Sequence, residues 1–172
     1  MRMDVRPAVV QDLPQLQTVY KQIIANRNRN QIQIWDAVYP CEVFQEDIKS
    51  NRLFVLTSKD EIIAAFSLWN AHAGAYAMNW KNSQAEAWYL DRLGVHVDHT
   101  RKGIGSFMLQ KAMELARTSG IAYLRLFVVD TNAPAIHLYM KNGFTKGKGS
   151  YDEVIDNDRI LHMLGYEAEL SL

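Results

Sequence analysis

Apolar residues that recur every three or four positions predict four helices in this chain. Asp12 stands before the first helix as a candidate N-terminal cap, and Pro14 falls in its first turn. Asn132 stands in the same way before the fourth helix, and Gly143 follows that helix as a candidate end signal. We expect helices at residues 13–25, 41–50, 104–119 and 133–142, and a polar loop at residues 26–30.

Continuous apolar runs bounded by turn residues predict the strands. The run at residues 121–129 contains a single charge, Arg125, as expected for a central strand that is covered on both faces. The resulting order, β-α-α-β-β-β-α-β-α-β-β, predicts an α/β protein of the α+β type, with a mixed central sheet and helices on both faces. We expect strands at residues 3–7, 53–57, 62–69, 88–97, 121–129, 144–148 and 159–166, and mostly loop at 72–84.

The composition is that of a globular protein without net charge. A chain of 172 residues is long enough for one buried core, so we expect a single domain over residues 1–172. Nineteen basic residues balance nineteen acidic ones, which argues against nucleic acid or a membrane surface as the main partner. The start from Met1 to Arg6 lacks the apolar stretch of a signal peptide, and the single cysteine, Cys41, allows no internal disulfide. We therefore expect a cytoplasmic protein.

A glycine-containing loop enters the third helix and is a candidate anion site. Arg101 and Lys102 precede Gly103 and Gly105, and the helix begins between the two glycines. A helix N-terminus offers backbone N–H groups, and the missing Cβ atoms let a phosphate come close to them. The dinucleotide and nucleoside-triphosphate loops do not match this spacing. A tight turn with glycines that serve only packing stays open as the alternative.

Two further motifs, taken together with this loop, resemble the GNAT superfamily of N-acetyltransferases. The strand before the loop reads Leu93-Gly94-Val95, and the loop itself runs from Thr100 to Gly105. The second motif, Asn-x-x-Ala-x-x-Leu-Tyr-x-x-x-Gly-Phe, is matched from Asn132 to Phe144. The upstream segments Arg6-Pro7-Ala8 and Trp35-Asp36-x-x-Tyr39-Pro40 are also similar to bacterial-type members, so the resemblance covers most of the chain.

The resemblance implies the acyl-CoA N-acyltransferase fold and transfer of an acetyl group from acetyl-CoA to a primary amine, by direct attack in a ternary complex. Tyr139 corresponds to the family's general acid, which protonates the departing thiolate. The positions that correspond to cofactor-binding residues are Leu93, Val95, Arg101, Lys102, Gly103, Ile104, Gly105, Ser106 and Asn132.

Two departures from the family pattern affect the expected chemistry. Thr100 stands where Gln or Arg is usual, so one side-chain contact to phosphate is expected to be missing unless Arg101 replaces it. Phe127 stands where some protein-acetylating members have an acidic residue, which leaves Glu86 and Asp91 as candidates for the general base.

The acceptor and the assembly stay open at this point. A small-molecule amine and a peptide amine are both compatible with the sequence, and a homodimer is expected only from base rates. The alternative to an enzyme is a non-catalytic module that binds acyl-CoA with the same fold. The five histidines are scattered without the spacing of metal ligands, so we expect no metal site.

Overall fold

The computed structural model describes residues 3–30, 35–36 and 39–171. Met1 and Arg2, which belong to the segment in which the sequence predicted no signal peptide, lie outside the described residues. The described chain forms two compact units. Unit 1 comprises the residues up to Leu68 together with Arg92–Met108, and unit 2 comprises Trp69–Asp91 together with Leu109–Leu172. Three elements contribute to both units: strand β5 (Ala87–Val95), helix α3 (Ile104–Thr118) and strand β3 (Glu61–Trp69), of which the last residue lies in unit 2.

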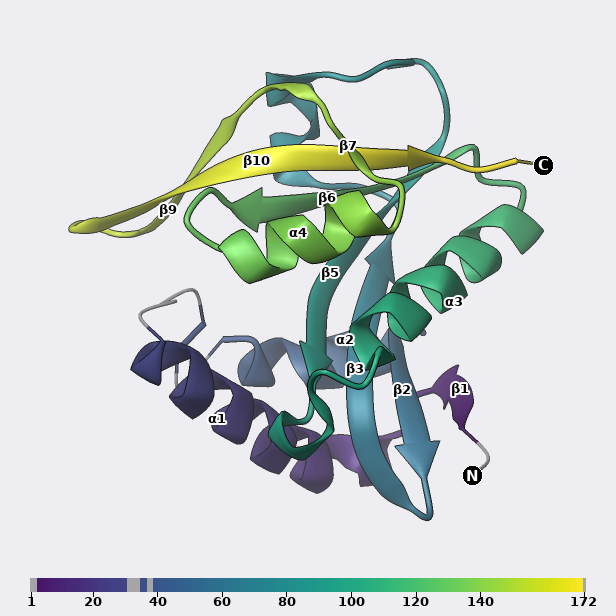
Figure 1. Cartoon of the computed structure of the whole chain (residues 1–172), viewed down its shortest axis with the longest axis vertical. Coiled ribbons are helices and arrows are strands. Elements are labelled where there is room, and N and C mark those ends of the chain that lie inside the picture. Colours follow the sequence, from purple (N-terminus) through teal and green to yellow (C-terminus); the bar gives the residue numbers. More distant parts are fainter. Residues whose placement is uncertain (1–2, 31–34, 37–38, 172) are drawn as a thin grey trace. The chain divides into compact units, whose positions relative to one another are not determined.

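Unit 1 is an antiparallel set of strands covered by helices (Figure 1). Strand β1 pairs with β2, and β2 pairs with β3 through the turn at Lys59 and Asp60, both of which have positive φ. The second half of β5 follows β3 in the sheet order. The elements of this unit are β1 (Asp4–Pro7), α1 (Leu13–Arg29), α2 (Phe44–Lys49), β2 (Leu53–Ser58), β3 (Glu61–Trp69, of which Trp69 belongs to unit 2) and the short 3-10 helix η4 (Val97–His99).

The core of unit 1 forms where the apolar stripe of α1 meets α2 and the strands. Leu16 and Tyr20 are fully buried on α1, and the Tyr20 ring packs edge-on against Phe44 of α2 at 4.7 Å between centroids. Leu53 and Val55 of β2 complete the same cluster. The predicted helical spacing of the first helix therefore describes its buried face.

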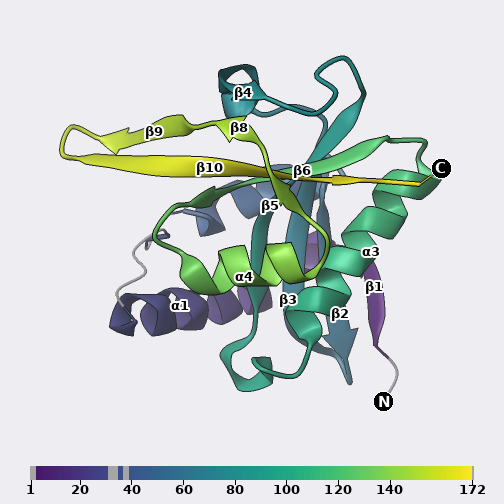
Figure 2. The ribbon, with the colours of Figure 1, turned by 45° about the horizontal axis from the view of Figure 1, so that its top comes forward.

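Unit 2 is built around two long neighbours, β6 and β10. The first half of β5 pairs with β6 in parallel, whereas β6 pairs with β10 in the antiparallel direction, so the sheet is mixed as predicted. Strands β9 and β10 form an extended hairpin, and β4 pairs with β8 in a small second sheet (Figure 2). The elements are β4 (Met78–Asn79), β6 (Tyr123–Val129), α4 (Ala133–Lys141), β7 (Thr145–Lys146), β8 (Lys148–Gly149), β9 (Tyr151–Asp156), β10 (Arg159–Glu169) and the 3-10 helix η3 (Ala73–Ala77).

The buried charge in the central strand β6 is paired. Arg125 is 3% exposed and lies 3.4 Å from Glu167 of β10, measured between Nε and Oε1. Its Nη2 group donates to the carbonyl of Asn82, and Glu167 accepts the backbone N–H of Lys81. A buried charge needs such a partner, which explains how an apolar strand accommodates an arginine.

The fold class is confirmed, and several local predictions are wrong. The polar loop at residues 26–30 is helical as far as Arg29, because its Asn and Arg side chains lie on the solvated side of α1 and Asn30 donates to the carbonyl of Asn26. The strand predicted at 88–97 ends at Val95, since His96 accepts the N–H of Asp98 and starts η4.

Asp12 does not cap the first helix with its side chain. Its carboxylate instead accepts two hydrogen bonds from the Arg6 guanidinium and one from the Val9 N–H, and these contacts hold the pKa of Asp12 below its usual value. Strand β9 was missed altogether, and residues 72–84 contain η3 and β4 in addition to loop.

Candidate active site

The loop that enters α3 has the backbone expected of an anion site. Arg101 and Gly103 have φ of 60° and 78°, and the first helical bond of α3 runs from the Phe107 N–H to the Gly103 carbonyl. The N–H groups of Ile104 and Gly105 precede that bond, where helix geometry supplies no carbonyl. A Cβ added to Gly103 would meet no atom within 4 Å, so open space adjoins the loop.

The charged side chains of this loop are exposed. Lys102 is held in place by a 3.1 Å hydrogen bond from Nζ to the carbonyl of Asp98, and Arg101 is exposed beside it. Thr100 donates its hydroxyl to the Val97 carbonyl, so it braces η4. The helix dipole, the open space and the two cations together fit a phosphate or pyrophosphate group.

The strand that leads into this loop contains a strained residue held by a buried ion pair. Arg92 has φ of 55°, which is uncommon for a residue other than glycine. Its guanidinium donates from Nε at 2.7 Å and from Nη2 at 2.8 Å to Asp47, which also accepts the hydroxyl of Ser67. The carbonyl of Arg92 accepts the hydroxyl of Tyr20 at 2.5 Å. These contacts hold the strained backbone in place immediately before Leu93.

Gly94 lies where α1 approaches β5. A Cβ at this position would come within 2.9 Å of both the Ile23 Cδ1 and the Tyr20 Cζ atoms. Tyr20 is fully buried, and burial raises the pKa of its phenol. The glycine between Leu93 and Val95 is therefore required by packing, and it keeps this stretch of backbone close to α1.

Asn132 and Tyr139 lie on the helix that follows β6. Asn132 is 6% exposed; its side-chain oxygen accepts the Ala135 N–H at 3.4 Å, as predicted for a helix cap. Tyr139 is half-buried, and its ring packs against Phe144 with 6.0 Å between centroids. The predicted strand and loop residues thus belong to unit 1, whereas Asn132 and Tyr139 belong to unit 2.

Glu86 and Asp91, the candidate bases from the sequence, differ in exposure, and the structure adds Glu153 as a third candidate. Glu86 is exposed, and Asp91 is half-buried. Glu153, on the unpredicted strand β9, has its pKa raised by burial and by repulsion from Asp91. A carboxyl group with a raised pKa is a better general base near neutral pH than an ordinary one. Nothing in the local sequence around Glu153 indicates this neighbour.

Three potential metal ligands meet in unit 1. Glu61, His96 and His99 offer ligand atoms that all lie within 4.8 Å of one another. The Nδ1 atom of His96 accepts the Asp98 N–H, which in the neutral ring places the proton on Nε2, 3.9 Å from Glu61. An Nε2 that bears a proton is a donor to the carboxylate and not a metal ligand, so the hydrogen bond favours an imidazole–carboxylate cluster.

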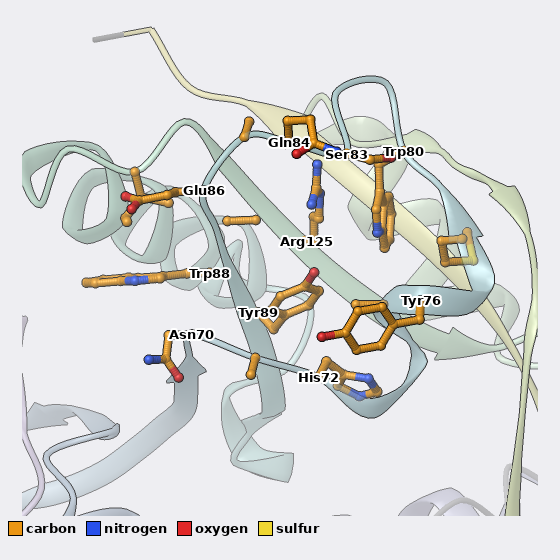
Figure 3. A pocket seen from close by; sticks show the side chains of 16 residues that line it. Asn70, His72, Tyr76, Trp80, Ser83, Gln84, Glu86, Trp88, Tyr89 and Arg125 are labelled. Carbon is orange, nitrogen blue, oxygen red and sulfur yellow. The ribbon is translucent and has the colours of Figure 1, made fainter.

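An aromatic cavity of about 780 Å³ lies within unit 2 (Figure 3). Its walls come from residues 70–89 and from the start of β6. Several aromatic residues line this cavity. These are Tyr76, Trp80 and Trp88, joined by His72 and Tyr89.

The mixed sheet and the glycine-containing loop before α3 are those of one class of protein, the acyltransferases. Residues 20–144 match the model of the Acetyltransferase (GNAT) family, which is well over half of the chain. The chain therefore belongs to the GNAT family of acetyltransferases. No helix in the described part of the chain combines the length and the apolar character needed to cross a bilayer.

Curated relatives agree with this family. YwnH of Bacillus subtilis (strain 168), provisionally named as a phosphinothricin acetyltransferase, is 27% identical over 150 residues, which is 84% of this chain and 85% of YwnH. Streptothricin acetyltransferase of Streptomyces lavendulae is 34% identical over 99 residues, covering 58% of this chain and 47% of that enzyme. The solved structure of yncA from Salmonella typhimurium, described with its cofactor acetyl-CoA, shares the fold. Its TM-score is 0.72 at 17% identity, over 100% of this chain and 96% of that one.

Proposed function

We propose that this protein transfers the acetyl group of acetyl-CoA to a primary amine by direct attack, without an acyl-enzyme. The open loop at the start of α3 is the observation on which the proposal depends, because it combines helix N–H groups with open space at Gly103. We further propose that residues 1–172 act as one N-acetyltransferase domain of the cytoplasm.

Each predicted cofactor residue has a role that fits its local structure. Backbone groups of Leu93 and Val95 would pair with the pantetheine arm, beside the rigid backbone of Arg92. The loop Arg101-Lys102-Gly103-Ile104-Gly105-Ser106 would hold the pyrophosphate through its N–H groups and its two cations. Asn132 would contact the cofactor arm while it caps α4.

The chemistry requires one proton to be removed and one to be supplied. When bound, acetyl-CoA supplies a thioester whose carbonyl carbon the amine attacks. An alkylamine is mostly protonated at neutral pH, since its pKa is about 10. We propose that the pair Asp91 and Glu153 accepts the amine proton, in preference to the exposed Glu86, because the raised pKa of Glu153 suits a base. Tyr139 would donate the proton that the departing thiolate takes up.

The acceptor is an amine on a small molecule or a peptide. The relatives support the small molecule, since the names of YwnH and the streptothricin enzyme both refer to small amine-bearing compounds. No metal, nucleic acid or membrane takes part in the proposed reaction, and assembly as a homodimer is compatible with it.

The loop is tested by a matched pair of variants at the two ends of α3. Gly103 and Gly120 have φ of 78° and 79°, and a Cβ at either meets no atom within 4 Å. Asp at either position therefore adds similar backbone strain, but only Gly103→Asp adds negative charge at the proposed phosphate site. Acetyl-CoA at a hundred times its Kd stabilises a protein by about 2.7 kcal/mol, or about 5–10 °C here.

We expect acetyl-CoA, but not ATP or NAD, to raise the Tm of the parent protein and of Gly120→Asp. Gly103→Asp should lose that rise, and the neutral Gly103→Asn should keep part of it. If acetyl-CoA raises the Tm of the two Asp variants equally, the loop does not bind the cofactor. Binding without release of CoA thiol in the presence of any of a panel of amines would favour the non-catalytic alternative.

A further inference from the structure

The aromatic cavity of unit 2 is lined by a buried hydrogen-bond donor, the indole N–H of Trp80. Trp80 is 7% exposed, and its buried indole Nε1 has no hydrogen-bond partner among residues 3–30, 35–36 and 39–171. A buried donor left unsatisfied costs about 1–3 kcal/mol, so such groups are rare unless a ligand completes them. Figure 3 shows the indole nitrogen on the side of the ring that faces Arg125 and Tyr89, inside the cavity.

A second donor adjoins the first. The Arg125 guanidinium lies over the Trp80 ring, 4.7 Å from its centroid. Its Nε and Nη2 atoms bond Glu167 and the Asn82 carbonyl, and its Nη1 group makes no hydrogen bond with any of the residues that the structure describes. Indole and guanidinium groups donate but cannot accept, so what binds between them must present acceptor atoms.

The aromatic side chains that line the cavity favour a planar ligand. Trp80, Tyr89, Trp88 and His72 present ring surfaces around the cavity, and planar rings pack best against other rings. Tyr76 is 98% exposed, yet it belongs to the cavity lining, with its hydroxyl directed toward the other rings in Figure 3. An aromatic side chain with so little packing of its own is available to cover a bound molecule.

We propose that this cavity binds a planar aromatic molecule that bears a carbonyl or carboxylate oxygen. The oxygen accepts hydrogen bonds from Trp80 Nε1 and Arg125 Nη1, and the rings of Tyr89 and Trp88 pack against the ligand. Glu167 keeps Arg125 in place from the other side. This binding site does not depend on the proposed acetyl transfer, because every group named here belongs to unit 2 and none is assigned to the cofactor.

The test is isothermal titration calorimetry of the purified full chain without acetyl-CoA, using four matched compounds. The compound 2-naphthoate has the flat ring and acceptor oxygens, and 2-naphthamide has the same ring with a neutral carbonyl. Decahydro-2-naphthoate keeps the carboxylate on a puckered ring, and 2-(aminomethyl)naphthalene keeps the flat ring with a donor only. We expect the first two to bind, with their ratio distinguishing carboxylate from carbonyl, and the last two to bind at least tenfold more weakly.

Variants assign the binding to this cavity. Trp80→Phe removes the donor and should weaken 2-naphthoate at least tenfold, the loss expected for one hydrogen bond to a charged group. Trp35→Phe, in unit 1 and outside the cavity lining, is the matched control, for which we expect less than a threefold change. Tyr76→Ala alters a fully exposed residue, so it should fold normally and weaken binding severalfold. The proposal is overturned if 2-naphthoate gives no heat at millimolar concentration, if the puckered or the amine compound binds equally well, or if a folded Trp80→Phe retains full affinity.

Discussion

Replacing Asp47 by Asn should destabilise this protein far more than an ordinary surface change. Asp47 and Arg92 are 1% and 6% exposed, and the carboxylate accepts two bonds from Arg92 and one from Ser67. The substitution preserves shape but leaves the buried guanidinium without its counter-charge. Removing one partner of a buried pair costs about 3–5 kcal/mol. Since Asn keeps one acceptor oxygen, we expect the lower end, about 3 kcal/mol, which corresponds to about 6–12 °C in Tm.

The assay is urea unfolding at pH 7, with two comparison proteins. Glu46→Gln removes the neighbouring exposed charge on α2 and should change the free energy of unfolding by less than about 0.5 kcal/mol. The double variant Asp47→Leu/Arg92→Met removes both charges, so it should recover most of the loss. A cost below about 1 kcal/mol for Asp47→Asn, or a double variant no more stable than the single one, would refute the idea that this pair holds the strained backbone.

Three further predictions concern the site and its support. Tyr139→Phe should lower kcat in an amine-dependent assay of thiol release and leave the Kd of acetyl-CoA within about twofold; unchanged turnover would exclude Tyr139 as the acid. Gly94→Ala should cost about 1–3 kcal/mol in thermal unfolding, because its Cβ would press on the buried Tyr20 ring, and a neutral result would show that α1 can move. Asp12 has a lowered pKa, so the stability it contributes is present above its unfolded pKa of about 4 and is lost as pH falls through its folded pKa. Asp12→Asn should therefore cost up to about 1 kcal/mol at pH 7 and clearly less at pH 3, whereas a constant difference would contradict the pairing with Arg6.

Local signals made the two helices in the second half of the chain predictable. The helix expected at 104–119 is found at Ile104–Thr118, because Gly103 and Gly120 mark its ends with positive φ. The cap at Asn132 is also local, since the side chain bonds an N–H three residues ahead. The candidate phosphate loop could be predicted for the same reason, because its signal is contained in the six consecutive residues 101–106.

Features that depend on distant partners were not predictable. Strand β9 is mostly polar and exposed, so it has no apolar alternation, and only pairing with β10 makes it a strand. The positive φ of Arg92 depends on Asp47, 45 residues earlier in the chain. The neighbourhood of Glu153 and Asp91 is likewise a product of the fold, which is why the sequence offered Asp91 as a base without its partner.

The ion pair between Arg125 and Glu167 also constrains how this sequence can diverge. The same two side chains bind the Asn82 carbonyl and the Lys81 N–H, so they hold a loop as well as each other. A change at either position alone would leave one buried charge and one loop contact unsatisfied. Homologous chains should therefore keep both residues or replace both, and where they replace both, the segment at 81–82 should change in length or composition as well.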